Sequence, residues 1–263
     1  MKPGLFALLA ALVFVLAACD SGGGLPKLTV SDYSEKTIET GTPLQMDIDC
    51  GNGSIELYSW NKKEVKFEIT RTVRGREERE YLLKRLDGFK LDIGAEAGRV
   101  YLKSGFTGGR GHVEGLADFR IYIPKKTAAI RLVQKDGSLH FLDDFNGDIS
   151  VEAGDLAVDI NRLEGKLTCK LDRGDVDVSS GELGNGSSVR VENGNIRIKA
   201  AFEEAGSYNI GTGFGILDLC LPEETNAVFE AYGMLEAADF SEGERPSRFR
   251  LESKTGKISI QKF

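Results

Sequence analysis

Aspartates gather in one stretch of this sequence. Between residues 143 and 177 there are eight: Asp143, Asp144, Asp148, Asp155, Asp159, Asp172, Asp175 and Asp177. On strands about 4.8 Å apart, such carboxylates could form a ladder. A ladder could coordinate Ca²⁺, or it could supply the acid and the base of a polysaccharide-active enzyme. The alternative is solvated charge that keeps the edges of a sheet from pairing with other chains.

Three of these aspartates follow a glycine directly, and they are the candidates for a metal site: Asp148, Asp155 and Asp175. The stretch NGDISVEAGDLAVDI, residues 146–160, holds the first two Gly-Asp pairs. In other repeats the position after the glycine is occupied by Ser138, Lys166, Asn195 and Lys257. A coordinating or proton-transferring position does not exchange a carboxylate for an ammonium group. We therefore predict that the pair mainly marks the start of a strand, and we assign neither a metal ligand nor a catalytic residue.

The two histidines of the chain, His112 and His140, complete no known catalytic or zinc motif. His112 lies in the glycine-rich segment GFTGGRGHVEGL, residues 105–116, whose spacing does not match a phosphate-binding loop. His140 alternates out of an expected strand. We therefore predict solvated histidines and no cofactor.

A repeat fills the C-terminal half of the chain. Its units are DGSLHFL, NGDISV, AGDLAV, EGKLTC, RGDVDV, NGNIRI, FGILDL and TGKISI, and they begin at residues 136, 146, 153, 164, 173, 193, 214 and 255. A glycine recurs about every 20 residues, which is typical of a solenoid. Because side chains alternate along a strand, the aliphatic residues of each unit should face one common core. Among them are Ile149, Val151, Leu156, Val158, Leu167, Cys169, Val176, Val178, Ile196 and Ile198. The predicted fold is all-β: a β-solenoid with short strands in coils of about 20 residues.

Residues 28–263 are expected to form one domain, less regular over 28–124 and regular over 125–263. The segment REEREYLLKRLD, residues 76–87, is rich in helix-forming residues and precedes Gly88. It is the one short helix that the sequence predicts.

The first residues, MKPGLFALLAALVFVLAAC, carry one lysine and then an apolar run too short for a membrane span of about 20 residues. The end of the run, Leu16-Ala17-Ala18-Cys19, resembles the bacterial lipobox. This resemblance implies a signal peptide over 1–18, cleavage before Cys19, a lipid on the Cys19 sulfur, and a flexible tether over 19–27. We therefore expect a protein that is extracytoplasmic and lipid-anchored to the bacterial cell membrane. An ordinary signal peptide cut after Ala18 is the alternative.

The composition argues against nucleic acid as a partner, because the net charge is −7 and no strongly basic cluster stands out. Besides Cys19, the chain has Cys50, Cys169 and Cys220, with no spacing typical of a zinc site. The alternation predicts that Cys50 and Cys169 face inward as small hydrophobic residues and that Cys220 faces the other side.

The repeats, the strand-then-proline signatures at 123–124 and in LCLPEETNA (219–227), and the final ESKTGKISIQKF together resemble the bacterial putative-adhesin family of β-repeat domains. The resemblance covers roughly residues 40–263. It implies a right-handed single-stranded β-helix or a closely related β-solenoid, and the family supplies no catalytic residues to carry over. The expected function is therefore non-enzymatic contact with envelope proteins or polysaccharide. The rival is a carbohydrate-active β-helix enzyme, a lyase or a hydrolase, that would show a groove with converging carboxylates and a Lys or Arg along one sheet face. A binding or structural module would show a carboxylate ladder without convergence, or exposed aromatic residues.

Overall fold

The computed structural model describes residues 27–41, 43–108 and 112–263. Its first strands are β1 (Leu28–Glu39), β2 (Leu44–Trp60), β3 (Glu64–Gly75), β4 (Phe89–Glu96), β5 (Arg99–Phe106) and β6 (Glu114–Pro124). The remaining strands are β7 (Thr127–Asn146), β8 (Asp148–Gly165), β9 (Leu167–Arg173), β10 (Val176–Val178), β11 (Gly181–Leu183), β12 (Ser188–Asn193), β13 (Ile196–Lys199), β14 (Ala201–Phe202), β15 (Ser207–Phe214), β16 (Leu217–Leu221), β17 (Ala227–Ala237) and β18 (Ser247–Lys262). The all-β class predicted from the sequence is confirmed. The segment predicted as a helix contains α1 (Arg79–Arg85), which continues into the 3-10 turn η1 (Leu86–Gly88).

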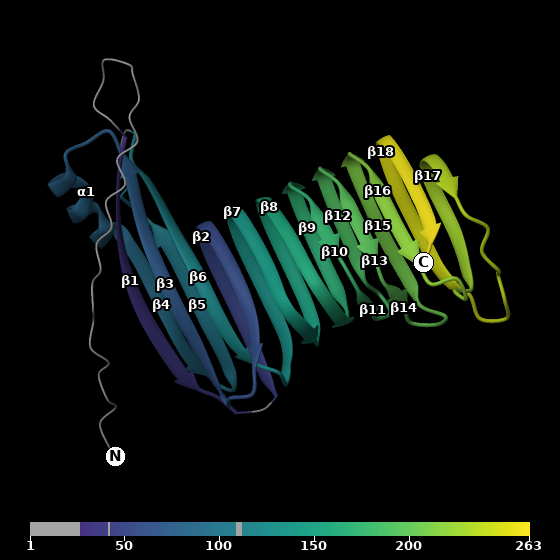
Figure 1. The fold of residues 1–263 in the computed structure, drawn as a ribbon, viewed down its shortest axis with the longest axis horizontal. Helices are drawn as coiled ribbons and strands as arrows, with labels where there is room; N and C mark the ends of the chain where they lie inside the picture. The colour runs from purple at the N-terminus through teal and green to yellow at the C-terminus, as the bar shows by residue number, and fades with distance from the viewer. Residues whose placement is uncertain (1–26, 42, 109–111) are drawn as a thin grey trace.

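Strands of both directions pair in the N-terminal part of the sheet. β1 pairs antiparallel with β3, β3 antiparallel with β6, and β4 antiparallel with β5. β2 runs parallel to β5, β6 and β7, and it thereby joins this part to the repeats. In Figure 1 the strands lie side by side along the long axis, with β1 and α1 near one end and β17 near the other.

The repeats pair parallel and in register, so equivalent residues form rows across the sheet. Val158 lies opposite Val176, Val176 opposite Ile196, and Ile196 opposite Leu217. All four side chains are at most 1% exposed and belong to one core cluster. The alternation read from the sequence is thus confirmed, because every aliphatic residue predicted to face inward is buried.

The predicted β-solenoid, or right-handed single-stranded β-helix, is wrong. In the described part of the chain the parallel pairings close on themselves in the order β8, β9, β12, β15, β18, β16, β13, β10 and again β8. Eight parallel strands therefore form a closed barrel, and the other strands are added to it. The physical reason is the length of two strands. β8 has 18 residues and β18 has 16, and each continues past the glycines that were expected to separate short strands.

Glycine is required where neighbouring repeats approach most closely. Gly174 has φ +118°, and a β-carbon there would lie 1.9 Å from the carbonyl oxygen of Leu156. Gly194 has φ +151°, and its β-carbon would lie 1.8 Å from the carbonyl oxygen of Gly174. Only a residue without a side chain fits both the space and the backbone angle.

No helix in the described residues is both long enough and apolar enough to cross a membrane.

Candidate functional site

Two of the Gly-Asp aspartates each accept a backbone N–H from a repeat that lies 18 or 20 residues further along the chain. The Asp148 carboxylate accepts the N–H of Lys166 at 3.0 Å, and the Asp175 carboxylate accepts the N–H of Asn195 at 2.6 Å. Asn195 continues the series, since its side-chain oxygen accepts the N–H of Ile216 at 2.9 Å. Asp155 instead forms an ion pair with Arg173 at 3.1 Å. These contacts give the position after the glycine a structural role, and asparagine can fill it because it also carries an acceptor oxygen.

The structure does not bring the eight aspartates together. Asp143 accepts the backbone N–H of Ser59, Asp159 pairs with His140, and Asp177 pairs with Arg197, at 2.9, 2.9 and 3.3 Å. In residues 27–41, 43–108 and 112–263, no three His, Cys, Asp or Glu side chains are grouped so that they could hold a metal ion. The described aspartates thus each contact a different partner, and their carboxylates do not converge on one point.

The two histidines lie apart. The Nδ1 atom of His140 is 2.9 Å from an Asp159 carboxylate oxygen on the outer face of the neighbouring strand. His112 is exposed beside Val113 and Glu114, where β6 begins. The two histidines therefore do not belong to one site.

Cys19, the predicted lipidation site, lies outside the described residues.

Three described cysteines are free thiols. Cys50 and Cys169 are buried in the core, as the alternation predicted. Burial raises the pKa of each thiol to about 12. Neither thiol is therefore ionised near neutral pH, and neither is an activated nucleophile. Cys220 is half-buried.

An aromatic cluster of Tyr58, Trp60 and Tyr122 lies on the outer face of β2 and β6. The Tyr58 and Tyr122 rings are stacked, with 5.0 Å between their centroids and 18° between their planes. The Trp60 ring lies 5.3 Å from that of Tyr122. All three side chains are half-buried, so each still offers part of its surface to a ligand. Clustered, partly exposed aromatic side chains are typical of binding sites.

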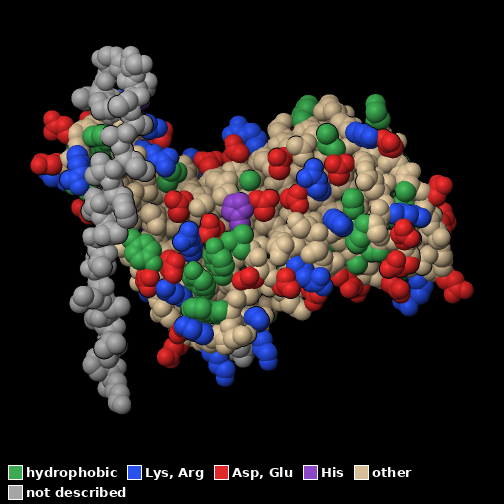
Figure 2. Space-filling view, viewed as in Figure 1, with side chains coloured by type: hydrophobic (Ala, Val, Ile, Leu, Met, Phe, Trp, Pro, Cys, Tyr) green, Lys and Arg blue, Asp and Glu red, His purple; other side chains and the backbone are tan. Residues whose placement is uncertain are grey.

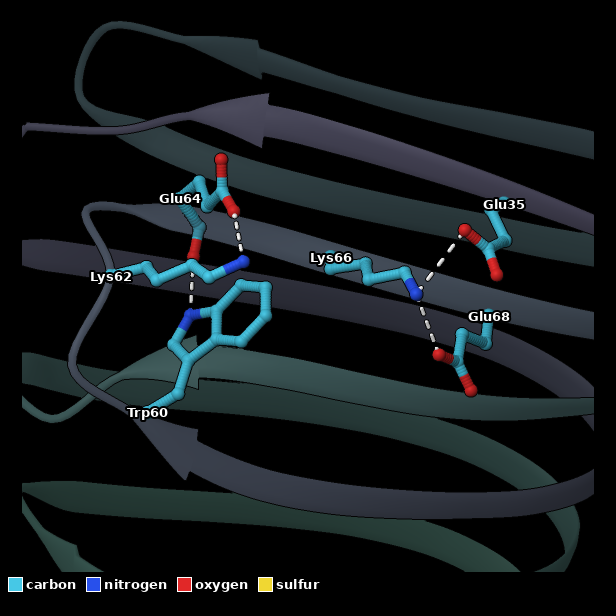
Figure 3. Close-up of polar contacts among 6 residues, drawn as sticks. All are labelled: Glu35, Trp60, Lys62, Glu64, Lys66 and Glu68. Atoms are coloured by element: carbon cyan, nitrogen blue, oxygen red, sulfur yellow. Dashed lines mark hydrogen bonds and ion pairs between the residues drawn. The ribbon is translucent and has the colours of Figure 1, made fainter. Parts of the chain in front are cut away.

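Lys62 and Glu64 contact Trp60, one of the three residues of the aromatic cluster (Figure 3). The Lys62 ammonium group lies 4.5 Å from the centroid of the Trp60 ring and pairs with Glu64 at 3.2 Å. The Trp60 ring nitrogen donates to the Glu64 carbonyl oxygen at 2.8 Å. Trp60 is therefore fixed by a hydrogen bond and by a cation over its face.

Lys66 joins two carboxylates beside the cluster (Figure 3). Its ammonium nitrogen lies 2.7 Å from Glu68 and 3.2 Å from Glu35, and also 5.8 Å from the Tyr122 ring centroid. The hydrogen bond to Glu68 raises the pKa of Lys66, against the opposing effect of burial. Hydrogen bonds from Tyr33 and then Lys66 lower the pKa of Glu35. Both groups are therefore charged at neutral pH.

A second polar group lies on the other side of Tyr58. Arg120 donates to Glu56 at 2.9 Å, and the Tyr58 hydroxyl donates to the same carboxylate at 3.0 Å. Burial and this hydrogen bond raise the pKa of Tyr58, so the phenol stays a donor at neutral pH. The hydrogen bond to Glu56 raises the pKa of Arg120.

A small hollow adjoins this polar group. Its volume is about 280 Å³, and it is lined by Tyr33, Ser54, Glu56, Glu68, Thr70, Asp118, Phe119 and Arg120. Pockets for drug-sized ligands are larger, about 300–1,000 Å³. The hollow therefore has room for one small polar unit and not for a large cofactor.

Figure 2 shows hydrophobic side chains gathered on one face of the molecule, with charges of both signs around them.

A larger cavity, of about 760 Å³, lies elsewhere on the sheet, over β2, β4 and β5. Acids and bases line it, including an Arg99–Asp47 ion pair of 2.8 Å. Its aromatic residue is Tyr101, whose ring packs over Gly94, since a β-carbon at Gly94 would lie 2.4 Å from the hydroxyl. This cavity lacks an aromatic cluster, so the face around Tyr58 is the better candidate site.

The sequence held a signal for the aromatic cluster that our prediction did not use. Tyr58 and Trp60 alternate with inward residues in IELYSW, and Tyr122 has the outward parity of Arg120 in FRIYIP. The alternation could have placed all three outside. It could not have placed them together, because that depends on the pairing of β2 with β6.

No protein-family model matches the chain, and no curated protein does. Among solved structures, a putative cell adhesion protein from Clostridium sporogenes is 14% identical, with 89% of this chain and 100% of that one covered and a TM-score of 0.38. A putative adhesin from Bacteroides fragilis is 12% identical, with 88% and 97% covered and a TM-score of 0.43. A putative lipid binding protein from Parabacteroides distasonis is 10% identical, with 87% and 96% covered and a TM-score of 0.33.

The descriptions of the first two structures agree with the family that the sequence resembles. Membership of this chain in the putative-adhesin family stays a prediction from its repeats.

Proposed function

We propose that this protein is a non-enzymatic binding module of the bacterial envelope and that its aromatic cluster binds uncharged polysaccharide. One observation carries the proposal: Tyr58, Trp60 and Tyr122 lie together on an outer face, within a frame of paired charges.

The chemistry of the face suits a sugar. A pyranose ring presents C–H groups that pack on aromatic rings, and its hydroxyls can bond to carboxylates and to ammonium groups. Tyr58 supplies ring surface, while Glu56 and Arg120 beside it supply an acceptor and a donor. The small polar hollow next to them could hold a neighbouring sugar unit of the same chain.

The charges of the face suit an uncharged ligand. Glu56 neutralises Arg120, while Lys66 faces the two carboxylates of Glu35 and Glu68, so the group keeps a surplus of negative charge. An anionic polymer would find no surplus of positive charge here, and the net charge of the chain, −7, repels it as well.

The rival, a carbohydrate-active enzyme, needs two carboxylates placed on either side of the bond to be broken, one of them protonated as the acid. At this face Glu56 and Glu68 accept hydrogen bonds from bases. Both carboxylates are thus engaged by a cationic side chain, Arg120 or Lys66, and do not stand free on either side of a bond to be broken. This chemistry supports binding over hydrolysis.

The proposed location rests on the sequence. The lipobox-like Leu16-Ala17-Ala18-Cys19 motivates a lipid anchor on Cys19 and an extracytoplasmic position. Lipid chains contribute about 0.8 kcal/mol per buried methylene, so two or more together hold a protein at a membrane. The anchor would keep the binding face close to envelope polysaccharide.

Affinity electrophoresis tests the proposed function. The protein is run in native gels that contain a soluble neutral glucan or mannan, with alginate as the anionic comparison. We expect a neutral polysaccharide to retard the wild type and to retard Tyr58→Ala and Tyr122→Ala much less. Tyr81→Ala is the matched control, because Tyr81 is also a partly exposed tyrosine but lies on α1.

Melting curves of all variants confirm that they are folded. Equal retardation of the wild type and Tyr58→Ala would contradict the proposed site. Migration unaffected by every neutral polysaccharide would contradict the proposed ligand.

A further inference from the structure

The last strand in the sheet, β17, has one free edge. Its residues pair with β18 along one side, from Ala227 to Ala237. The described residues place no strand on its other side, where a single bridge from Asn226 to Ser241 covers only the beginning. The backbone N–H and C=O groups along that side are therefore available to another strand.

This edge lacks the usual protection against pairing. Natural edge strands commonly carry lysine or proline, or they are covered by another segment. The sequence of β17, AVFEAYGMLEA, contains no Lys, Arg or Pro. At the opposite end of the sheet, Lys36 of β1 donates to the carbonyl oxygen of Ile93 in β4, so a lysine lies between those two outer strands.

Exposed apolar side chains gather at the same end of the molecule. Met234 is 74% exposed and Tyr232 47%. Further exposed hydrophobic residues of this end are Phe214, Ile216, Val228, Leu235 and Phe263. Large apolar patches on otherwise polar proteins mark interaction surfaces.

We propose that β17 pairs antiparallel with β17 of a second copy of this chain, so that two molecules join end to end. Charge is the reason for choosing a second copy. Each glutamate of the strand has a base beside it, because Glu236 pairs with Lys257 and Glu230 lies opposite Arg250. The charges of the strand itself are thus balanced, so β17 does not repel an identical strand.

The shape of the strand indicates where the twofold axis passes. A register shift at Gly233 divides β17 into two halves. Two copies can pair along both halves only if their shifts coincide, so the axis passes close to Gly233. Tyr232 of one copy then lies opposite Met234 of the other. Such a self-complementary pairing is the usual geometry of a symmetric dimer.

Sedimentation velocity measures the dimer directly. The full chain carries Cys19→Ala, so that no attached lipid can drive association. We expect a concentration-dependent dimer, converted to monomer by Met234→Lys. Leu142→Lys, at a leucine that is 44% exposed but lies on β7, should leave the dimer unchanged. A wild type that stays monomeric at all concentrations, or a dimer that persists in Met234→Lys, would overturn the proposal.

Cross-linking tests the antiparallel arrangement in a background that also carries Cys220→Ser. Opposed residues of antiparallel strands lie about 4.5–5.5 Å apart between Cα atoms, which a disulfide can span. Mild oxidation should link a mixture of Tyr232→Cys and Met234→Cys chains. A mixture of Val228→Cys and Met234→Cys should not link. If both mixtures link equally, the antiparallel pairing about Gly233 is wrong.

Discussion

Asp175 binds Asn195, the residue directly before β13: its carboxylate accepts the backbone N–H of Asn195 at 2.6 Å and the Asn195 side-chain amide at 3.1 Å. Asn195 then accepts the N–H of Ile216 at 2.9 Å. A Gly-Asp pair is therefore explained by strand geometry. It sits where a glycine bends the backbone and a side-chain oxygen is needed to bind the next strand.

The first prediction separates the charge of Asp175 from its hydrogen bonds. Asp175→Asn keeps an acceptor oxygen, so it should change the free energy of unfolding by no more than about 0.5 kcal/mol. Asp175→Ala removes the acceptor and should cost about 1 kcal/mol. Urea denaturation measures both. An equal loss in the asparagine and alanine variants would show that the negative charge itself matters.

The second prediction concerns the close approach at Gly174. Gly174→Ala places a β-carbon 1.9 Å from the Leu156 carbonyl oxygen at φ +118°, so neighbouring backbones must move apart. Gly98→Ala is the matched control, since Gly98 has φ +80° but nothing within 4 Å of the added carbon. We expect about 1 kcal/mol of destabilisation for Gly98→Ala and roughly 4 kcal/mol or more for Gly174→Ala. Similar melting temperatures for the two variants would mean that the repeats are not packed this closely.

The third prediction uses the thiols as probes of the core. Burial raises the pKa of Cys50 and Cys169 from 9.0 to about 12. A thiol whose folded pKa is raised contributes stability that is fully present below its unfolded pKa and is lost as the pH rises toward the folded value. Stability should therefore fall between about pH 9 and pH 12.

A thiol reagent at pH 8 tests the burial of these thiols, which is the cause of their raised pKa. The chains carry Cys19→Ala. Cys220 should react in the folded protein, while Cys50 and Cys169 should react only after denaturation. Cys220→Ser should then abolish the reaction of the folded protein. Rapid labelling of Cys169 without denaturant would contradict its place in the core.

The fourth prediction concerns the anchor. If Cys19 carries lipid, Cys19→Ala should move the protein from the membrane fraction of its bacterial host to the soluble fraction. Detergent partitioning followed by immunoblotting measures this change. A Cys19→Ala variant that still enters the detergent phase as the wild type does would remove the lipid-anchor hypothesis.

The rows of the core could be predicted from the sequence because alternation is a local property. The pattern of RGDVDV and NGNIRI placed Val176 and Ile196 inside, and the structure pairs them directly. The closure of the sheet could not be predicted in this way. Glycines in the sequence indicated strand breaks, but in β8 the strand continues past Gly154.

The aromatic cluster shows the same limit. Local alternation indicates that Tyr58 and Tyr122 face outward. Their stacking, however, depends on the parallel pairing of β2 with β6, which joins residues far apart in the chain. The antiparallel pairing of β3 with β6 then brings Lys66 beside Tyr122. Such long-range register is fixed by the whole sheet and leaves no local signal in the sequence.

The fluorescence of Trp60 shows directly whether the aromatic cluster binds uncharged polysaccharide. The chain contains one tryptophan, so its emission reports on this site alone. We predict that a neutral polysaccharide that retards the protein in gels changes the Trp60 emission to a saturating value. The change should be lost in Tyr58→Ala and kept in Tyr81→Ala. Emission that stays constant through a titration in which the polysaccharide demonstrably binds would contradict the claim, because the ligand would then bind elsewhere.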